Sequence, residues 1–380
     1  MKKDWTYKKL GEVATYVNGY AFKPETWSDK GLPIIRIQNL NNANAAFNYY
    51  EGELPEKYVV EEGDLLISWS ASLGAYYWKG QKAYLNQHIF KVVFDKSDIL
   101  KSFLKYAVEA KLEEMKRKVH GATMQHIVKK DFDNTTIPVP PISIQESIIR
   151  ELDAIHGILE KKKEQLRELD NLSQSLFYQM FGDPITNPMG WEIKKLGEVG
   201  TFERGKGISK SDFVEDGVPC VHYGQLHTAF GAYTTKHLAC IPESLIDNPR
   251  IAHPGDVLLA LTSEDVEGSC KSTAWYGDYD IIVGSDAAVY HHNQDGMYIS
   301  FYTRTEAFYK QKEKYAHGFK VTHISTKDIE TFTIPLPPLS LQQSFAAKVS
   351  AIEAQKQAIT QSIQHTEALL AQRMDNYFGI

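Results

Sequence analysis

Two long stretches of the chain repeat apolar residues with the spacing of a paired helix. They lack proline and run from Ser143 to about Met180 and from Ser340 to about Tyr377. Apolar residues at alternating steps of four and three form the narrow seam of a coiled coil, whereas a helix on a broad core has a wider apolar face. The first helix would extend about 57 Å at 1.5 Å per residue. The expected seam residues are Ile148, Leu152, Ile155, Leu159, Leu166, Leu169, Val349, Ile352, Ile359, Ile363 and Leu370.

The two helices are expected to pair antiparallel, so that residues near Ile148 meet residues near Leu370 or Tyr377. The alternative is two amphipathic helices that each pack on their own domain. One lysine lies near the middle of each seam, Lys162 and Lys356. A polar residue there specifies the register of the pair at some cost in stability, unless its side chain extends outward into solvent.

A mixed portion precedes each helix. Short apolar runs at 34–37, 65–67, 90–94 and 257–261 are bounded by Gly, Pro and Asn, and they predict strands. A helical stretch follows at 99–118 in the first portion and at roughly 298–315 in the second. A proline-rich segment then separates each mixed portion from its long helix.

This order of parts occurs twice. Trp5 to Val13 (WTYKKLGEV) recurs as Trp191 to Val199 (WEIKKLGEV), and TIPVPP from Thr136 recurs as TIPLPP from Thr333. Solenoid repeats have a period of roughly 20–50 residues. The distance along the chain from a motif in the first copy to the same motif in the second copy is far longer, so each copy is a domain. The sequence predicts an α+β fold of two mixed α/β domains separated by two long helices, with approximate two-fold symmetry. The expected parts are residues 1–142, 143–182, 183–339 and 340–380.

Composition is that of a globular protein, with 24% charged and 43% hydrophobic residues in 380. No run of about 18 apolar residues is present, which argues against a membrane span. Three widely spaced cysteines fit a reducing cytoplasm. The net charge of −6 argues mildly against a general polyanion binder. Residues 181–339 hold 14 basic and 21 acidic groups but eight of the thirteen histidines, so nucleic-acid binding there requires local basic groups or neutral donors.

Sequence motifs for catalysis are incomplete. The segment from Gly200 resembles a phosphate-binding loop, but Gly207 stands where Ser or Thr should hold Mg²⁺. Asp183 and Glu192 have a nuclease-like spacing that the first copy lacks. Cys220 and His222 have no second half for a zinc site. No glycine-rich loop for S-adenosylmethionine is present, so we expect neither a metal, nor a cofactor, nor catalysis.

The paired motifs resemble a known family. Two domains that open with Trp-x-x-Lys-Lys-Leu-Gly-Glu-Val and end with Ile-Pro-x-Pro-Pro-x-Ser-x-Gln and a long helix are similar to the specificity subunit of type I DNA restriction–modification systems. The resemblance covers essentially the whole chain, including the joint Phe181-Gly182-Asp183-Pro184.

The resemblance implies a non-catalytic reader of double-stranded DNA. Each mixed domain would be a target-recognition domain for one half of a bipartite sequence, and the helices would set the distance between the halves. The implied partners are two methyltransferase subunits, which modify adenine at N6, and motor–nuclease subunits, which cut unmodified DNA. Two similar domains joined by antiparallel helices also match the dyad of duplex DNA, with half-sites roughly 34–36 Å apart. The alternatives are an enzyme that uses unrecognised residues and a coiled-coil adaptor without DNA sequence recognition.

Residues that read bases should lie where the two copies differ. Arg can donate to guanine and Asn or Gln can bind adenine in the major groove, although each candidate alone can also be an ordinary surface group. The candidates in the first domain are Asn18, Tyr20, Lys23, Arg36, Gln38, Asn39, Ser68, Trp69, Ser70, Asn86, Gln87 and His88. Those in the second domain are Arg204, Lys206, His222, Tyr223, Gln225, Thr262, Ser263 and Ser285.

A second group of residues has the character of a phosphate contact. Cations at a helix end, a glycine turn and small polar donors can follow a DNA backbone without reading bases. Compensation of the helix dipole with a glycine cap explains the same pattern. The phosphate candidates are Lys116, Arg117, Lys118, Thr123, Gln125, Lys320, Thr322 and His323.

Overall fold

The computed structural model describes residues 5–42, 44–70, 72–118, 128–315 and 322–379, with the backbone alone at 116–118. The chain divides into two compact units: unit 1 is Met1–Lys163 with Gln361–Ile380, and unit 2 is Glu164–Thr360. Each unit holds one mixed domain and parts of both long helices, α5 (Ile142–Phe181) and α11 (Leu339–Phe378). Within the described residues, none of the helices combines the length and apolar character needed to cross a bilayer.

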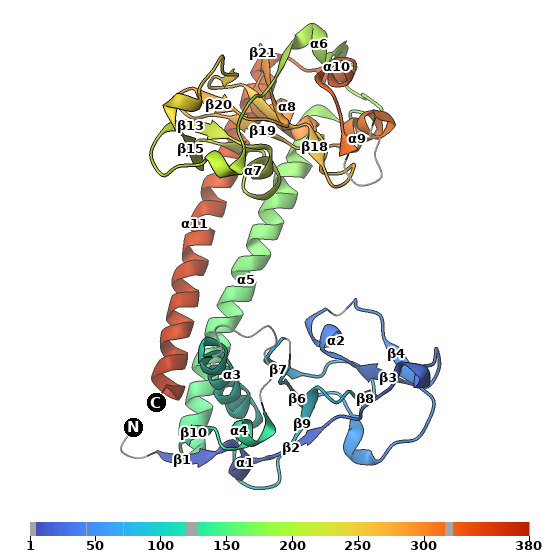
Figure 1. Ribbon diagram of the computed structural model, residues 1–380, viewed down its shortest axis with the longest axis vertical. Helices are drawn as coiled ribbons and strands as arrows, with labels where there is room; N and C mark the ends of the chain where they lie inside the picture. Colours follow the sequence, from blue (N-terminus) through green and yellow to red (C-terminus); the bar gives the residue numbers. More distant parts are fainter. Residues whose placement is uncertain (1–4, 43, 71, 119–127, 316–321, 380) are drawn as a thin grey trace. The chain divides into compact units, whose positions relative to one another are not determined.

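The mixed domain of unit 1 combines short strands, short helices and one longer helix, α3 (Figure 1). Its elements are β1 (Thr6–Lys9), α1 (Leu10–Val13), β2 (Thr15–Asn18), η1 (Pro24–Thr26), β3 (Leu32–Ile35), α2 (Ile37–Asn41), β4 (Asn48–Tyr50), η2 (Glu56–Tyr58), β5 (Val59–Val60), β6 (Leu65–Ser68), β7 (Gly74–Tyr77), β8 (Ala83–Leu85), β9 (Ile89–Val93), α3 (Lys101–Lys118), α4 (Lys129–Asp133) and β10 (Thr136–Val139).

The mixed domain of unit 2 follows the same order with additions. Its elements are β11 (Glu192–Lys195), α6 (Leu196–Val199), β12 (Gly200–Arg204), η3 (Lys210–Asp212), β13 (Val218–Val221), α7 (Tyr223–Thr228), β14 (Tyr233–Thr234), β15 (Ala239–Ile241), η4 (Glu243–Leu245), β16 (Ile251–Ala252), β17 (Val257–Ala260), β18 (Thr262–Ser263), β19 (Ser272–Trp275), β20 (Ile281–Val283), β21 (Ala287–His292), α8 (Gly296–Tyr302), α9 (Glu306–Lys312), η5 (Glu313–Tyr315), β22 (Thr322–His323), α10 (Thr326–Glu330) and β23 (Thr333–Leu336).

Two sheets with matching strand order form the frame of each mixed domain. The orders are β2-β9-β6-β7 and β4-β3-β8-β5 in unit 1, and β12-β21-β17-β19-β14 and β15-β13-β20-β16 in unit 2. The pairs β3–β8 and β13–β20 are parallel at equivalent places. Unit 2 adds β14 and the β18–β22 pair. The predicted repeat of two mixed domains is confirmed.

The repeated opening motif closes each domain on itself. β1 pairs with β10, and β11 pairs with β23, in antiparallel register. After these strands the backbone N–H of Leu10 donates to Thr135 O (2.9 Å) and that of Leu196 to Phe332 O (2.8 Å). The motif's glutamate accepts from the backbone at the helix start, as Glu12 does at 2.9 Å. The motif is therefore structural.

The glutamine of the closing motif ties each long helix to its domain. Gln145 is 1% exposed, accepts from the backbone N–H of Leu100 (2.9 Å) and donates to Pro140 O (2.9 Å). Gln342 is fully buried and repeats the pattern with Asp295 N (3.0 Å) and Pro337 O (2.8 Å). A buried amide satisfied at both ends fixes the start of the helix.

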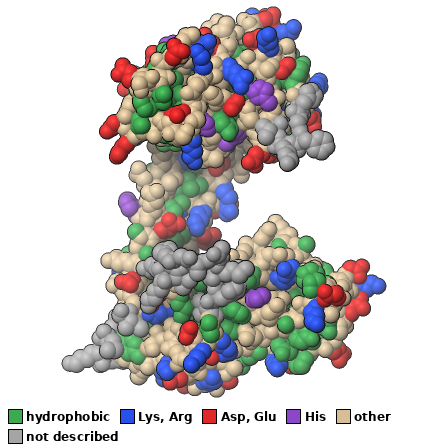
Figure 2. Space-filling model, in the orientation of Figure 1, with side chains coloured by type: hydrophobic (Ala, Val, Ile, Leu, Met, Phe, Trp, Pro, Cys, Tyr) green, Lys and Arg blue, Asp and Glu red, His purple; other side chains and the backbone are tan. Residues whose placement is uncertain are grey.

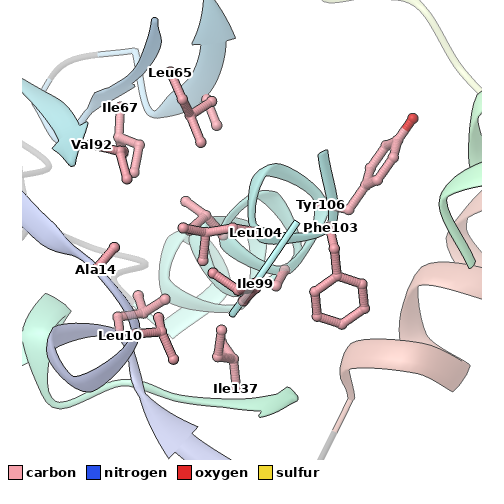
Figure 3. Close-up of a cluster of buried hydrophobic side chains, with 14 of the residues drawn as sticks. Leu10, Ala14, Leu65, Ile67, Val92, Ile99, Phe103, Leu104, Tyr106 and Ile137 are labelled. Carbon is pink, nitrogen blue, oxygen red and sulfur yellow. The ribbon is translucent and has the colours of Figure 1, made fainter. Parts of the chain in front are cut away.

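The core of unit 1 lies between the sheet, α3 and the ends of the long helices. Figure 3 shows side chains from α1, β6, β9, α3 and β10, among them Leu10, Leu104 and Ile137, gathered around one centre. Ile148 of α5 and Phe378 of α11 belong to the same cluster. The corresponding cluster in unit 2 includes Phe177 and Phe345. Each fully buried large apolar side chain contributes about 1.5–3 kcal/mol.

Two predicted segments differ in detail from the structure. The helical stretch expected at roughly 298–315 is helical but divided, because the Thr305 hydroxyl accepts from the backbone N–H of Phe308 (3.4 Å) and caps a new helix, α9. The apolar run at 34–37 does not stay extended: β3 ends at Ile35 and α2 begins at Ile37, because the Asn39 side chain accepts from the backbone N–H of Arg36 (3.0 Å).

The long helices pair antiparallel in each unit. In unit 1, Glu151 forms an ion pair with Arg373 (2.9 Å) and accepts from the Tyr377 hydroxyl (2.5 Å). In unit 2, Asp170 pairs with Lys356 (2.6 Å). Partners on α11 thus descend in number as those on α5 ascend, which confirms the predicted direction.

Six of the expected seam residues are buried, and five are half-buried. The buried ones are Ile148, Leu152, Ile155, Leu159, Val349 and Ile352; the half-buried ones are Leu166, Leu169, Ile359, Ile363 and Leu370.

The two seam lysines do not extend outward into solvent. Lys162 donates to Ser362 Oγ (2.6 Å) and Thr366 Oγ1 (2.8 Å) across the helix pair in unit 1. Lys356 bonds Asp170 and, at 2.7 Å, Glu353 in unit 2. Burial alone would lower the pKa of Lys356, but the bonds to the two carboxylates outweigh it and raise the pKa above its ordinary value.

Candidate nucleic-acid interface

Four segments that are distant in the sequence meet at one edge of the first mixed domain. Tyr20, just after β2, forms a bridge with Asn86. The backbone N–H of Asn86 donates to Ile35 O (3.2 Å), one residue before Arg36. The ring of Trp69, just after β6, lies 5.5 Å from the ring of His88. These contacts define the first candidate surface, made of Asn18, Tyr20, Arg36, Trp69, Asn86, Gln87 and His88.

The equivalent four segments meet in the second mixed domain. The backbone N–H of Lys206 donates to Val283 O (3.2 Å), beside the turn that precedes β21. Gly284 N donates to Val221 O (2.9 Å), one residue before His222. Leu261 N donates to Asp286 O (2.8 Å), one residue before Thr262. The second candidate surface consists of Arg204, Lys206, His222, Thr262, Ser285 and Asp286.

A glycine allows the close approach at both surfaces. A Cβ on Gly19 would lie 2.1 Å from Asn86 O, and a Cβ on Gly205 would lie 2.0 Å from Gly284 O. Any side chain at either position would therefore push the strand end away from the turn. The glycine after β12 thus serves backbone packing, in place of the phosphate loop that the sequence only partly matched.

Aromatic and amide groups dominate the first candidate surface. The Tyr20 ring is 36% exposed and packs edge-on against Tyr58 at 5.5 Å. The Arg36 guanidinium lies 5.1 Å from the centre of the Trp27 ring, and its Nη1 donates to Asn48 Oδ1 (3.1 Å). The buried Oε1 of Gln87 has no hydrogen-bond partner among the described residues.

Charged groups dominate the second candidate surface. Arg204 Nη2 donates to Asp286 Oδ1 at 3.0 Å, and Lys206 Nζ lies 3.9 Å from Asp247. His222 Nδ1 accepts from the backbone N–H of Gly224 (3.2 Å). Burial lowers the pKa of His222, with only partial opposition from Asp286, which favours the neutral imidazole.

Three base-reading candidates are buried, and a fourth, Gln225, is half-buried and bonded to the backbone. Asn39 is 7% exposed, and its amide donates to Ala45 O (3.2 Å). Ser68 is fully buried and Ser70 is 5% exposed. Gln225 accepts from the backbone N–H of His222 (2.9 Å) at the start of α7. These bonds give the four residues a role in the fold, and their role in reading bases stays a prediction. Lys23, Gln38, Tyr223 and Ser263 are exposed or half-buried.

The phosphate candidates are only partly accessible to structural description. Thr123, Gln125 and Lys320 lie outside the described residues, as do the side chains of Lys116, Arg117 and Lys118. Thr322 is 5% exposed and pairs with Ser263 in the β18–β22 ladder, and its role as a phosphate contact stays a prediction. His323 is exposed, and its Nδ1 lies 3.1 Å from Thr262 Oγ1.

A cleft of about 1080 Å³ in unit 2 adjoins the second candidate surface. Tyr223, Thr262 and Ser263 line it together with three cations, which each donate to a backbone carbonyl. These bonds join Lys271 to His227 O (2.7 Å), Arg304 to Ser272 O (2.7 Å) and Lys312 to Glu267 O (2.6 Å). The cations hold the walls of the cleft.

Charges of both signs are interspersed on each unit in the view of Figure 2. Within the part of the chain that the structure describes, no three His, Cys, Asp or Glu residues come together as a metal site. Asp286 was not anticipated from the sequence. The sheet register identifies it. Asn18 pairs with Phe90 in unit 1 and Arg204 pairs with Ala288 in unit 2, and His88 and Asp286 each lie two residues before those partners, so Asp286 corresponds to His88.

Comparison with known proteins agrees with this architecture. The family model described as "Type I restriction modification DNA specificity domain" matches residues 2–169 and 188–367. The chain is 24% identical over 378 residues to the type I restriction enzyme MjaVIII specificity subunit of Methanocaldococcus jannaschii, covering 92% of this chain and 86% of that protein. It is 26% identical over 192 residues to the EcoBI specificity subunit of Escherichia coli, covering 50% of this chain and 40% of that protein.

Solved structures share the fold. A chain from a study of complex assembly and conformational transition in a type I R-M system aligns with a TM-score of 0.62 at 18% identity, covering 99% of this chain and 98% of that one. The S subunit of the type I system of M. genitalium aligns with a TM-score of 0.52 at 13% identity, covering 100% and 98%. The chain belongs to the type I restriction–modification DNA specificity family, whose general role is DNA target recognition.

Proposed function

We propose that this chain is the non-catalytic subunit that reads a bipartite double-stranded DNA target for a type I restriction–modification complex. The observation that carries the proposal is the pair of candidate surfaces, one per mixed domain. The sheet register places them at equivalent positions, but their side chains differ. Equivalent positions with different donors and acceptors suit two half-sites of unlike sequence.

The partners follow from the family. Two methyltransferase subunits would modify adenine within the target, and motor–nuclease subunits would cut unmodified DNA, in the cytoplasm. The chain itself would need no cofactor. Lys118 and Lys320 would add contacts to phosphate, so removing each charge should flatten the dependence of log K on log salt by nearly one unit.

The paired helices would set the distance between the half-sites. Support comes from the 40-residue length of α5 and of α11 and from the bonds that fix their register at Lys162 and Lys356. Inserting four residues near Gln165 would lengthen one helix by about 6 Å, close to two base pairs. Both half-sites should keep their sequences while the gap between them grows.

Exchange of residues 1–142 with those of a second family member tests the modular reading. Cells that carry the exchanged chain with its methyltransferase subunit are sequenced for methylated adenine. One half of the methylated motif should change and the other half should stay. A change in both halves contradicts the proposal, and an adaptor without DNA recognition would give no motif at all.

A further inference from the structure

An exposed ion pair belongs to the second candidate surface. Arg204 ends β12, and Asp286 lies in the turn before β21. Their side chains are 56% and 39% exposed, and one N–H of the guanidinium bonds one carboxylate oxygen at 3.0 Å. Arginine has five N–H donors and a carboxylate has two acceptor oxygens, so the pair keeps both donors and acceptors for a ligand.

The backbone holds both members of the pair in place. Asp286 has a φ of +60°, in the left-handed region that Asp and Asn tolerate better than most residues. Its carbonyl accepts from Leu261 N (2.8 Å), and Gly205, next to Arg204, packs directly against Gly284 O. The guanidinium is therefore oriented before any ligand arrives, which lowers the entropy lost on binding.

The fold does not require this ion pair. At the same register positions the first mixed domain has Asn18 and His88. An exposed pair of this kind also contributes little to stability. As a phosphate anchor the pair would be poor, because its carboxylate repels the phosphate.

We propose that Arg204 and Asp286 together read a G·C base pair in the half-site of the second mixed domain, an inference that rests on the proposed function. Arg204 donates to O6 and N7 of guanine, and the free oxygen of Asp286 accepts from N4 of the paired cytosine. In an A·T pair Arg204 keeps only the N7 acceptor, because the N6 amino group of adenine stands where O6 of guanine would accept, and the contact of Asp286 fails because O4 of thymine faces the carboxylate. One well-placed contact of this kind discriminates by roughly five- to a hundredfold.

The test uses the full chain bound to its methyltransferase subunit and a pool of random duplex DNA, with selection and sequencing of the bound fraction. Arg204→Gln should abolish the G·C preference at one position of one half-site. Asp286→Asn, which suits the left-handed backbone, should weaken the same preference and strengthen binding to non-specific DNA by freeing the arginine charge. Lys310→Gln is the matched control, since it removes an exposed pair with Glu306 (3.8 Å) on α9 and should keep the motif.

The outcomes separate this inference from the function beneath it. If the unaltered chain selects a bipartite motif and either variant selects the same motif with an unchanged G·C preference, the Arg204–Asp286 reading is wrong. If the unaltered chain selects no motif, the proposed function itself fails. Thermal unfolding close to that of the unaltered chain shows that the variants are folded.

Discussion

At one equivalent place in their sheets, the two mixed domains have an ion pair whose acidic and basic members have exchanged strands. β5 pairs with β8, and β16 with β20, in the same antiparallel register. At the end of that ladder unit 1 has Glu61 facing Lys82 (3.9 Å), whereas unit 2 has His253 facing Asp280 (2.8 Å). The shared fold is thus carried by backbone register and buried residues, and the exposed polar pairs are free to differ.

Where the long helices enter the cores, the two units differ in bulk. Unit 2 buries Phe177, Phe181 and Phe345 in contact with one another, with ring centres 5.1–5.7 Å apart. In unit 1 the core at the same helix ends contains Ile148 and Phe378, with Met374 packed against it. The long helices therefore bury different side chains in the cores of the two units.

The largest expected effect comes from Phe345→Ala. Its ring is fully buried, so the cavity should cost about 3–5 kcal/mol. Hydrogen exchange followed by peptide should show faster opening in unit 2 and little change in unit 1, with the converse for Ile148→Ala. Leu172→Ala, at a residue that is 50% exposed, is the control and should stay near the unaltered chain. Equal loosening of both units by either substitution would contradict two separate cores.

Gly19→Ala and Gly205→Ala test what the domains share. Each methyl group would collide with a backbone carbonyl, so each should destabilise its own unit by about 1–3 kcal/mol. Thermal unfolding measures the loss. Gly157→Ala, in open space on α5, is the matched control and should stabilise by about 1 kcal/mol. A tolerated alanine at only one of the two positions would break the equivalence of the surfaces.

The seam lysines should differ when each is replaced by methionine. Lys356→Met leaves Asp170 and Glu353 without their cation and should cost about 0.5–1 kcal/mol. Lys162→Met removes bonds to neutral hydroxyls, one of which, on Thr366, also bonds its own helix at Ser362 O (2.7 Å), so stability should stay within about 0.5 kcal/mol. Urea unfolding measures both changes in stability. A larger loss of stability for Lys162→Met than for Lys356→Met would contradict the prediction.

The smallest effect is a pH dependence confined to unit 2. The bond to Asp280 raises the pKa of His253, and Asp256 adds to the shift. A raised pKa means that the pair's stability is full below about pH 6.5 and is lost as pH rises through the folded-state pKa. Because the pair is half-exposed, the loss stays well under about 1 kcal/mol. NMR titration should place the His253 midpoint above about 6.5, and His253→Asn should remove the contribution of this pair to the pH dependence.

The sequence was sufficient for the repeat, the seam and the direction of the helices, because these depend on periodicity and on motifs such as that ending at Gln145. It did not separate exposed from buried polar residues. Asn39 and Ser68 are residue types that usually lie on the surface, but here both are buried and their polar groups are satisfied by local hydrogen bonds. The pairing of Arg204 with Asp286 needed the sheet register, because the numbering offset between the copies changes along the chain.

The division of both long helices between the units has a consequence for synthesis. Unit 2 is one continuous segment, Glu164–Thr360, whereas unit 1 needs Gln361–Ile380 as well. Phe378 is fully buried in the unit 1 core and its ring lies 5.3 Å from that of Phe103. Synthesis runs from the N-terminus at about 5–20 residues per second, so all of unit 2 has been made before unit 1 receives Gln361–Ile380. The N-terminal domain, although made first, closes its core last, when the final turn of α11 arrives.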